Sequence, residues 1–311
     1  MVTGPGGTGK THLIKTIVEY GKNTGKRIQV CALTGCAAVL LECGAKTIHS
    51  WSGIGIASAD IGTMVERVCG NRYKSKAWRS VDLLIIDEVS MMSKKVFDIL
   101  DAIGRAVLKQ PLKPFGGLQV LFSGDFYQLP PVGDREEPDT MAFCFESAAW
   151  RQTFPYVVVL RSVFRQADPT YIKVLNQVRK GVLSKRSFAL LKARVIEPEA
   201  EAGLTVTQLV PRRCEADLIN AKAMKALDTE SLVFHLLPAK DVPEWPASRE
   251  KPPPVSAHAE ATEFAYLRSS VIVPRALELK VGAQVMCVAN INTDGPTPIV
   301  NGSRGVVKEF K

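Results

Sequence analysis

The sequence predicts an α/β fold built on a parallel β-sheet with helices on both faces. Residues 4–12 read GPGGTGKTH, which fits the phosphate-binding pattern G-x-x-x-x-G-K-[ST]. Downstream, short apolar segments alternate with amphipathic ones, the order typical of strands and covering helices in a parallel sheet. With 311 residues and 46% hydrophobic content, the chain is long enough to bury a sizeable core. Its length suggests about two domains.

The glycine-rich segment predicts a phosphate-binding loop that leads into a helix over about 10–21. Glycines lack a Cβ atom, so successive N–H groups curl around a phosphate, and the helix N-terminus adds a positive dipole. Lys10 supplies a charge for the β and γ phosphates, and the Thr11 hydroxyl is a ligand for Mg²⁺. The alternative is a glycine-rich turn before an ordinary helix. The residues that we expect to bind the nucleotide are Gly4, Gly6, Gly7, Thr8, Gly9, Lys10, Thr11 and His12.

Apolar segments later in the chain predict the remaining strands and helices. The expected strands of the first part are residues 27–33, 83–87, 118–123 and 157–160, the last of which begins a further unit. Apolar residues at helical spacing from Val96 to Val107 predict a helix, and another over about 171–180 ends at Gly181. A second part would contain strands at 205–210 and about 283–289, a helix between them, and a flexible proline-rich excursion over about 238–262.

Two adjacent acids end the strand in LLIIDEVSMM. Asp87 is expected to bind Mg²⁺, directly or through water, and Glu88 to orient and deprotonate an attacking water. An Asp-Glu pair alone is more often a solvated turn. Behind a phosphate-binding loop and at the carboxyl end of a buried strand, the pattern favours the functional interpretation.

The segment FSGDFYQLPPV follows the next strand, so Asp125 and Gln128 lie at the edge where α/β sheets bind ligands. The Gln128 amide both donates and accepts hydrogen bonds, which suits a sensor of the γ-phosphate. The alternative is a polar loop stiffened by Pro130 and Pro131.

Charge, cysteine content and hydropathy indicate which kinds of partner and which cellular compartment to expect. The formal net charge is +9, which suits a polyanion, and residues 169–196 carry seven basic residues and no acid, which is equally typical of a solvated helical face. The seven cysteines include no C-x-x-C pair, which favours a reduced, intracellular compartment and no metal besides Mg²⁺. No signal peptide and no run of eighteen apolar residues is present, so we expect no membrane partner.

Taken in order, the motifs resemble the petite-integration-frequency (PIF-type) DNA helicases of superfamily one, group B. They are GPGGTGKTH, ALTGCAAVLL, TIHSWSGIG, LLIIDEVSMM, SGDFYQLPPV, VFRQAD and LKVGAQVMCVANI with IVNGSRGVV. The resemblance implies a P-loop NTPase with two RecA-like lobes, here residues 1–153 and an incomplete second lobe over 154–311. It also implies ATP as cofactor, single-stranded and forked DNA as partners, and 5′ to 3′ translocation coupled to ATP hydrolysis.

The resemblance assigns further residues. Arg165 in VFRQ matches the arginine finger that the second lobe directs at the γ-phosphate, a role that suits its fixed planar charge. Matches to DNA-contacting motifs are Thr34, Gly35, Thr47, His49 and Ser50. For the neighbouring Trp51 we favour a buried, structural position.

The resemblance has gaps at both ends. Only three residues precede Gly4, whereas an average strand has about five or six, so the first strand should be incomplete. Neither the family's upstream glutamine, which reads adenine, nor its late motifs, with a second arginine, has a counterpart. We therefore expect a partial chain.

The leading hypothesis is an ATP-dependent DNA helicase of genome maintenance, including repair, recombination and telomere maintenance. It would act as a monomer in a nucleus or mitochondrion, or in a bacterial cytoplasm. The alternative is a nucleotide-switched DNA-binding fragment without unwinding activity. A P-loop kinase has less support, because no site for an acceptor substrate is readable.

Overall fold

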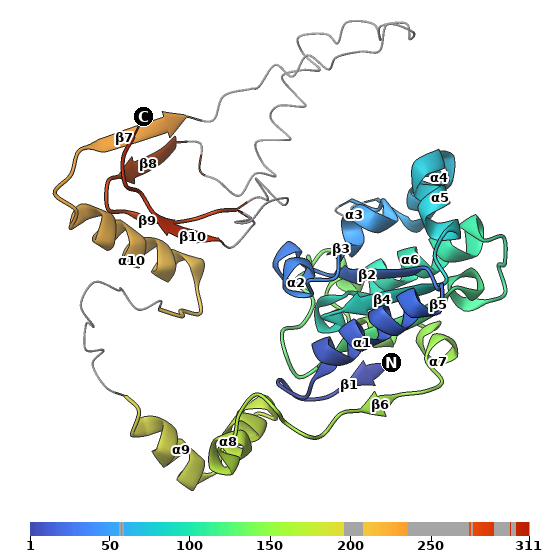
Figure 1. Ribbon diagram of the computed structural model, residues 1–311, viewed down its shortest axis with the longest axis horizontal. Helices are drawn as coiled ribbons and strands as arrows, with labels where there is room; N and C mark the ends of the chain where they lie inside the picture. Colours follow the sequence, from blue (N-terminus) through green and yellow to red (C-terminus); the bar gives the residue numbers. More distant parts are fainter. Residues whose placement is uncertain are drawn as a thin grey trace, which may run out of the picture. The chain divides into compact units, whose positions relative to one another are not determined.

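The computed structural model describes most of the chain as two compact units, Met1–Glu197 and Pro198–Lys311. The described residues are 1–55, 57, 59–195, 208–235, 274, 276–288, 299 and 303–310, without the side chains of Cys36, Val39 and Arg213. Each unit is described by itself below, and Figure 1 labels their elements. The predicted boundary between residues 153 and 154 stays a prediction.

The first unit alternates strands with helices. Its strands are β1 (Val2–Thr3), β2 (Ile28–Ala32), β3 (Lys46–Thr47), β4 (Leu83–Asp87), β5 (Gln119–Gly124) and β6 (Val158–Val159). Its helices are α1 (Lys10–Asn23), α2 (Gly35–Leu40), α3 (Ile48–Ser52), α4 (Ile61–Gly70), α5 (Arg72–Arg79), α6 (Lys94–Val107), α7 (Trp150–Thr153), α8 (Pro169–Arg179) and α9 (Lys185–Lys192).

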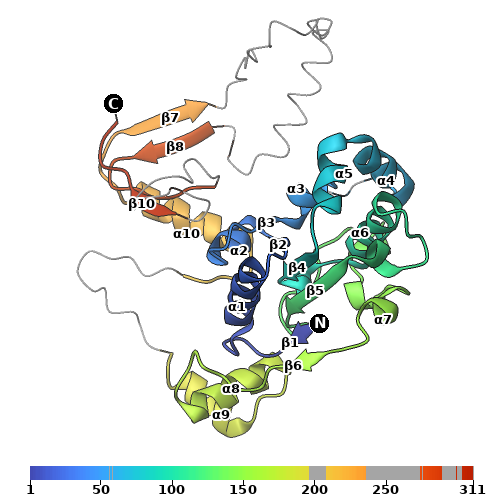
Figure 2. The ribbon, with the colours of Figure 1, turned by 45° about the vertical axis from the view of Figure 1, so that its right-hand side comes forward.

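The six strands form one sheet in the order β3-β2-β4-β5-β1-β6, and every pairing in it is parallel. The predicted parallel α/β sheet is therefore confirmed. The first strand is short, as predicted: only Val2 and Thr3 belong to it, yet it lies between β5 and β6 (Figure 2). Because all strands run the same way, their carboxyl ends meet at one edge of the sheet.

Both faces of the sheet are covered, and strand β4 shows why. Its buried side chains alternate: Ile85 packs with α1 residues Ile14 and Val18, whereas Leu84 and Ile86 pack with α6 on the opposite face. A strand buried on both sides needs apolar residues at every position, which explains the unbroken run LLII. The face covered by α6 also holds a cluster of aromatic rings around Phe97 and Phe122.

Helix ends follow local capping chemistry. The Ser93 hydroxyl accepts a hydrogen bond from the Val96 amide at the start of α6, 3.2 Å away. At the start of α8, the Asp168 carboxylate accepts from the Thr170 amide at 2.8 Å, and Pro169 takes the first helical position. Both arrangements satisfy N–H groups that have no partner within the helix. Gly181 follows α8 with a positive φ of 69°, which suits the predicted end of that helix.

The described part of the second unit is α10 (Arg213–Lys225), β7 (Ser231–His235), β8 (Ala276–Lys280), β9 (Gln284–Met286) and β10 (Arg304–Val306). Strands β7 and β8 pair antiparallel, as do β9 and β10. Among the described strands, parallel pairing therefore occurs in the first unit. The predicted strand at about 283–289 appears as β9. The proline-rich stretch at 238–262 and the first half of the predicted strand at 205–210 lie outside the described residues, and residues 208–210 do not belong to a strand. No helix in the described ranges is long and apolar enough to cross a membrane.

Candidate nucleotide and nucleic-acid site

The carboxyl edge of the sheet brings together the residues that the sequence analysis selected. The glycine-rich loop follows β1, Asp87 ends β4, Asp125 follows β5, and Thr34 follows β2 by two residues. Since β4 and β5 are in parallel register, with Ile86 opposite Phe122, Asp87 and Asp125 lie at the same edge of the sheet. The predicted site therefore rests on four neighbouring strand ends.

The loop between β1 and α1 is held in shape by a hydrogen bond from one of its own side chains. The Thr8 hydroxyl is buried and donates to the Pro5 carbonyl at 2.8 Å, so this predicted nucleotide ligand shapes the loop through its side chain. Gly9 precedes α1 with φ 87°, a left-handed conformation that glycine adopts without strain. Gly6 is exposed with open space where a Cβ would be, and Thr11 and His12 are exposed on the first turn of α1.

The Lys10 ammonium lies inside this loop, where it donates to the carbonyls of Gly4 at 2.8 Å and Pro5 at 3.0 Å. Burial lowers the pKa of Lys10, and the carboxylates of Asp125, Glu88 and Asp87 oppose that shift. The ammonium is thus the central cation of an acidic site.

Arg165 lies directly against the glycine-rich loop. The Phe164 amide donates to the Gly7 carbonyl at 2.8 Å, and a Cβ atom added to Gly7 would lie 2.7 Å from the Arg165 Cβ. Only glycine permits this approach, since real Cβ atoms do not come that close. The Arg165 side chain is exposed. The structure thereby joins two motifs that are far apart in the sequence.

Asp87 and Glu88 occupy different environments although they are adjacent. Asp87 is buried at the end of β4, and burial raises its pKa while Lys10 opposes the rise. Glu88 is half-buried with a positive φ of 57°, which is uncommon for a residue with a long side chain. Burial and the Asp87 charge raise the pKa of Glu88. A carboxylate with a raised pKa is a better proton acceptor, as the predicted base requires.

The residues fit Mg²⁺ by the chemistry of their donor atoms. The Asp87 carboxylate and the Thr11 hydroxyl are oxygen donors, which this hard cation prefers, and both flank Lys10 at the mouth of the loop. The described residues that would hold the ion are those that the sequence analysis named.

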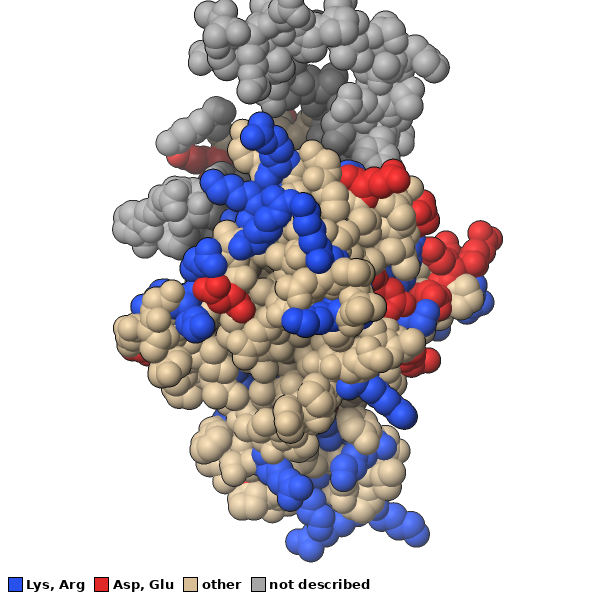
Figure 3. All heavy atoms as spheres, turned by 90° about the vertical axis from the view of Figure 1, so that its right-hand side faces the viewer, with Lys and Arg blue, Asp and Glu red and all other residues tan. Residues whose placement is uncertain are grey.

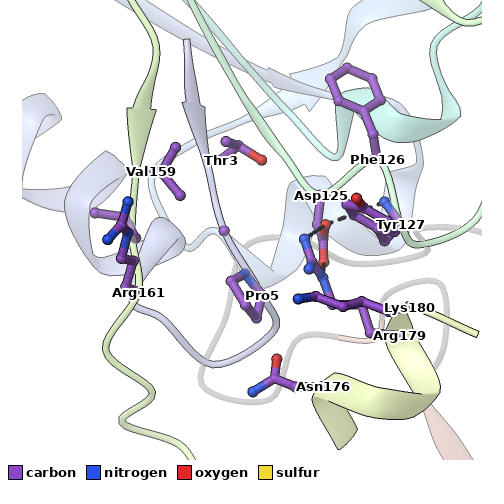
Figure 4. A pocket seen from close by; sticks show the side chains of 12 residues that line it. Thr3, Pro5, Asp125, Phe126, Tyr127, Val159, Arg161, Asn176, Arg179 and Lys180 are labelled. Carbon is purple, nitrogen blue, oxygen red and sulfur yellow. Dashed lines mark hydrogen bonds and ion pairs between the residues drawn. The ribbon is translucent and has the colours of Figure 1, made fainter. Parts of the chain in front are cut away.

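Asp125 makes a contact that sequence reasoning missed. It is 1% exposed and accepts two hydrogen bonds from the Arg179 guanidinium, Nε to Oδ2 at 2.7 Å and Nη2 to Oδ1 at 2.5 Å. The same carboxylate accepts from Gln128 Nε2 at 3.2 Å. Figure 4 shows Arg179, near the end of α8, reaching Asp125 beside the aromatic ring of Tyr127. The only sequence signal was the membership of Arg179 in a basic run, which suits a polyanion partner and a solvated helical face equally and indicates no partner within the protein.

Two cavities adjoin this contact. One, of about 540 Å³, is lined by Thr3 of β1, by Gly4 of the loop, and by Asn176 and Lys180 from the α8 region, as drawn in Figure 4. The other, of about 320 Å³, is lined by Gly6, Gln128 and Arg165. Pro5, Asp125 and Arg179 line both, so the ion pair borders both cavities.

The predicted DNA contacts lie at the ends of β2 and β3. Thr34 caps α2 by accepting from the Ala37 amide at 3.2 Å, and Gly35 is the first residue of that helix. Thr47 caps α3 by accepting from the Ser50 amide at 3.3 Å. Because Ala32 pairs with Thr47, the two caps share one edge.

The other side chains of this segment divide into exposed and buried ones. Thr34 and Ser50 are exposed, whereas His49 is half-buried, and that burial lowers its pKa. Trp51 is 5% exposed and packs on Trp78, with ring centroids 4.9 Å apart, as the structural interpretation predicted.

The face of the molecule drawn in Figure 3 carries charged side chains of both signs. Figure 3 shows Lys and Arg scattered over the view, with Asp and Glu gathered toward one side of it. Within the basic run of α8 and α9, Lys185 and Arg186 are exposed, whereas Arg179 is turned inward to Asp125. That inward arginine is not a surface cation.

Comparison with known proteins gives a consistent assignment. The family model described as PIF1-like helicase matches residues 1–187, and a model of the Pif1 DNA helicase 2B domain matches residues 265–310. The ATP-dependent DNA helicase RRM3 of Saccharomyces cerevisiae is 34% identical over 99% of this chain and 39% of its own length. The human ATP-dependent DNA helicase PIF1 is 34% identical over 99% of this chain and 44% of its own length. The chain thus spans about two fifths of the length of these curated relatives.

Solved structures agree with this similarity. Pif1 helicase from Candida albicans has a TM-score of 0.79 and 30% identity, covering 99% of this chain and 64% of that one. Bacteroides Pif1 in complex with ADP-AlF3 and single-stranded DNA has a TM-score of 0.68 and 26% identity, covering 100% of this chain and 66% of that one.

Proposed function

This chain belongs to the PIF1-like helicase family, and on that premise we propose that it binds ATP with Mg²⁺ and couples ATP hydrolysis to movement on DNA. The proposed movement is 5′ to 3′ along single-stranded DNA, with forked DNA as the natural substrate. The observation that carries the proposal is the meeting of Lys10, Asp87, Glu88 and Arg165 around one loop.

Each residue at the loop has a proposed role. The N–H groups of Gly4 and of residues 6–11 and the Lys10 ammonium would bind the phosphates, while Thr11 and Asp87 would hold Mg²⁺. When bound by these residues, Mg²⁺ would supply positive charge against the negative charge of the phosphates. Glu88 takes a proton from the attacking water, since its raised pKa suits a base.

Gln128 and Arg165 are proposed to act on the γ-phosphate from the opposite side. Arg165 lies against Gly7, so its guanidinium is near enough to contact the terminal phosphate after a side-chain rotation. Gln128 follows the same sheet edge and is exposed to the smaller cavity. Arginine and glutamine are the pair of residue types that stabilise charge and orient water in phosphoryl transfer.

DNA is proposed to lie along the ends of β2 and β3. The hydroxyls of Thr34, Thr47 and Ser50 and the backbone of Gly35 would contact phosphates, and His49 would stack on a base. These contacts carry no sequence information, which suits a motor that moves along any strand. We further propose a monomer that serves DNA repair, recombination or telomere maintenance, in a nucleus or mitochondrion or in a bacterial cytoplasm.

The test is the rate of phosphate release with and without single-stranded DNA. A motor should hydrolyse ATP much faster when the strand is added, and Glu88→Gln should remove both rates while leaving ATP bound. A P-loop kinase should be indifferent to the strand. Binding of ATP and DNA without stimulated hydrolysis would replace the motor by a nucleotide-switched DNA-binding module, to be followed by an unwinding assay on a fork.

A further inference from the structure

We propose that Arg179 is a positioning residue for ATP hydrolysis, which holds Gln128 in place through the Asp125 carboxylate. The inference rests on the proposed function, because it assigns Gln128 to the reacting phosphate. It is argued from the hydrogen bonds that the buried Asp125 carboxylate accepts from Gln128 and from Arg179, which come from separate parts of the fold.

Asp125 is the fixed point of this arrangement. It directly follows β5, it is 1% exposed, and its backbone carbonyl accepts from the Gln128 amide at 2.8 Å. Its Oδ1 atom also accepts from the Tyr127 amide at 3.3 Å. The carboxylate therefore shapes the turn that carries Gln128. Burial alone would raise the pKa of Asp125, but hydrogen bonds from Arg179, Tyr127 and Gln128 lower it below its ordinary value.

An ionised carboxylate determines which way the Gln128 amide faces. A carboxylate only accepts hydrogen bonds, so the nitrogen of the amide must face Asp125, where it lies 3.2 Å from Oδ2. The amide oxygen then points away, available to accept from a water molecule. Because Gln128 is an exposed residue, this hydrogen bond is the main restraint on its end group that the structure shows.

Arg179 keeps the carboxylate ionised and oriented. Its guanidinium binds both carboxylate oxygens in a fork, and its side chain is 18% exposed. The guanidinium also lies over the Tyr127 ring, 4.3 Å from the centroid. This geometry fixes the rotation of the carboxylate as well as its charge, which a lysine would not do. Arg179 therefore positions Gln128 although the two side chains do not bond to each other.

The first test is a cycle of hydrolysis measurements on Arg179→Ala, Gln128→Ala and the double variant. We expect Arg179→Ala to lower kcat roughly ten- to hundredfold, the cost of a displaced catalytic group, with little change in KM. If Arg179 acts through Gln128, the double variant should be no slower than Gln128→Ala. If the double variant lost kcat by the product of the two single-variant losses, the inference would be overturned. Arg151→Ala, an exposed arginine on α7, is the matched control and should leave the rate unchanged.

The second test separates positioning from charge and from folding. Arg179→Lys keeps the charge but loses the fork, so it should fold like the parent by circular dichroism and still lower kcat. Hydrogen exchange of the Tyr127 and Gln128 amides gives a readout without ATP: both should exchange about tenfold faster in Arg179→Lys. If the parent chain hydrolyses no ATP, the proposed function fails and this exchange experiment alone decides the inference. Unchanged exchange of both amides would overturn it.

Discussion

At the scale of single residues, Lys10 shows how charge is arranged around the loop. The ammonium donates to two backbone carbonyls and is attracted by three carboxylates, although burial lowers its pKa. A phosphate would bring negative charge to a cation that is already held in place. The residue is therefore expected to act mainly in nucleotide binding.

Lys10→Ala should weaken ATP binding roughly ten- to hundredfold, because a hydrogen bond to a charged group contributes about 1.5–3 kcal/mol. The measurement is titration of a fluorescent ATP analogue. Lys15→Ala is the matched control on the same helix, since Lys15 pairs with Glu42 at an exposed position. Equal affinities for the parent and Lys10→Ala would contradict the assignment of the loop.

Arg165 should affect ATP hydrolysis, whereas Lys10 should affect ATP binding. Arg165→Ala should leave ATP binding largely intact and slow hydrolysis by roughly a thousandfold, as arginine fingers do elsewhere. Single-turnover hydrolysis with saturating ATP measures this directly, and Arg151→Ala on α7 serves as the control. Hydrolysis that survives the substitution would remove Arg165 from the reaction.

The residue scale also shows what the sequence could and could not predict. The location of Lys10, Thr11, Asp87 and Glu88 at one edge of the sheet was predictable, because these residues belong to contiguous motifs that follow or end strands; their roles stay predictions. The pairing of Arg179 with Asp125 was not, because the two are 54 residues apart and no local pattern marks an arginine that turns inward.

At the scale of elements, the long strands and helices followed from apolar periodicity. Strand β4 coincides with the predicted residues 83–87, and α6 contains the predicted helix. The short elements were not predicted: β3 has two residues and α3 has five, too few to show a period. Strand β6 was expected to begin a further unit, yet it pairs with β1 at the edge of the first sheet.

The aromatic cluster between β5 and α6 should dominate the stability of the first unit. Phe122 is fully buried among Phe97, Phe115, Trp150 and Phe154, with ring centroids 4.7–6.1 Å from its own. Phe122→Ala should lower the free energy of unfolding by about 3–5 kcal/mol through the cavity that it leaves. Urea unfolding followed by tryptophan fluorescence measures the change. Tyr73→Ala, at a side chain that is 85% exposed, should change it by less than about 0.5 kcal/mol.

At the scale of the whole molecule, the net charge of +9 gives a prediction about DNA. If about five phosphates are contacted, affinity for single-stranded DNA should fall roughly hundredfold between 50 and 200 mM salt. Changing both Lys185 and Arg186 to Ala should make this dependence shallower if the basic run touches the strand. Fluorescence anisotropy of a labelled oligonucleotide provides the measurement, and an affinity that ignores salt would argue against phosphate contacts.

The two units were partly predictable from length and composition. A parallel sheet in the first unit was expected, whereas the antiparallel pairs β7–β8 and β9–β10 were not, because strand direction depends on connections that short apolar segments do not reveal. A model of the Pif1 2B domain matches residues 265–310, which agrees with a strand arrangement in this part of the chain that differs from the parallel sheet of the first unit.

The central claim is that a nucleoside triphosphate binds in the loop after β1. A crystal structure of the protein with a non-hydrolysable ATP analogue and Mg²⁺ tests it most directly. We expect the phosphates within the loop of residues 4–11 and the metal ion between Thr11 and Asp87. An analogue bound away from these residues would contradict the account.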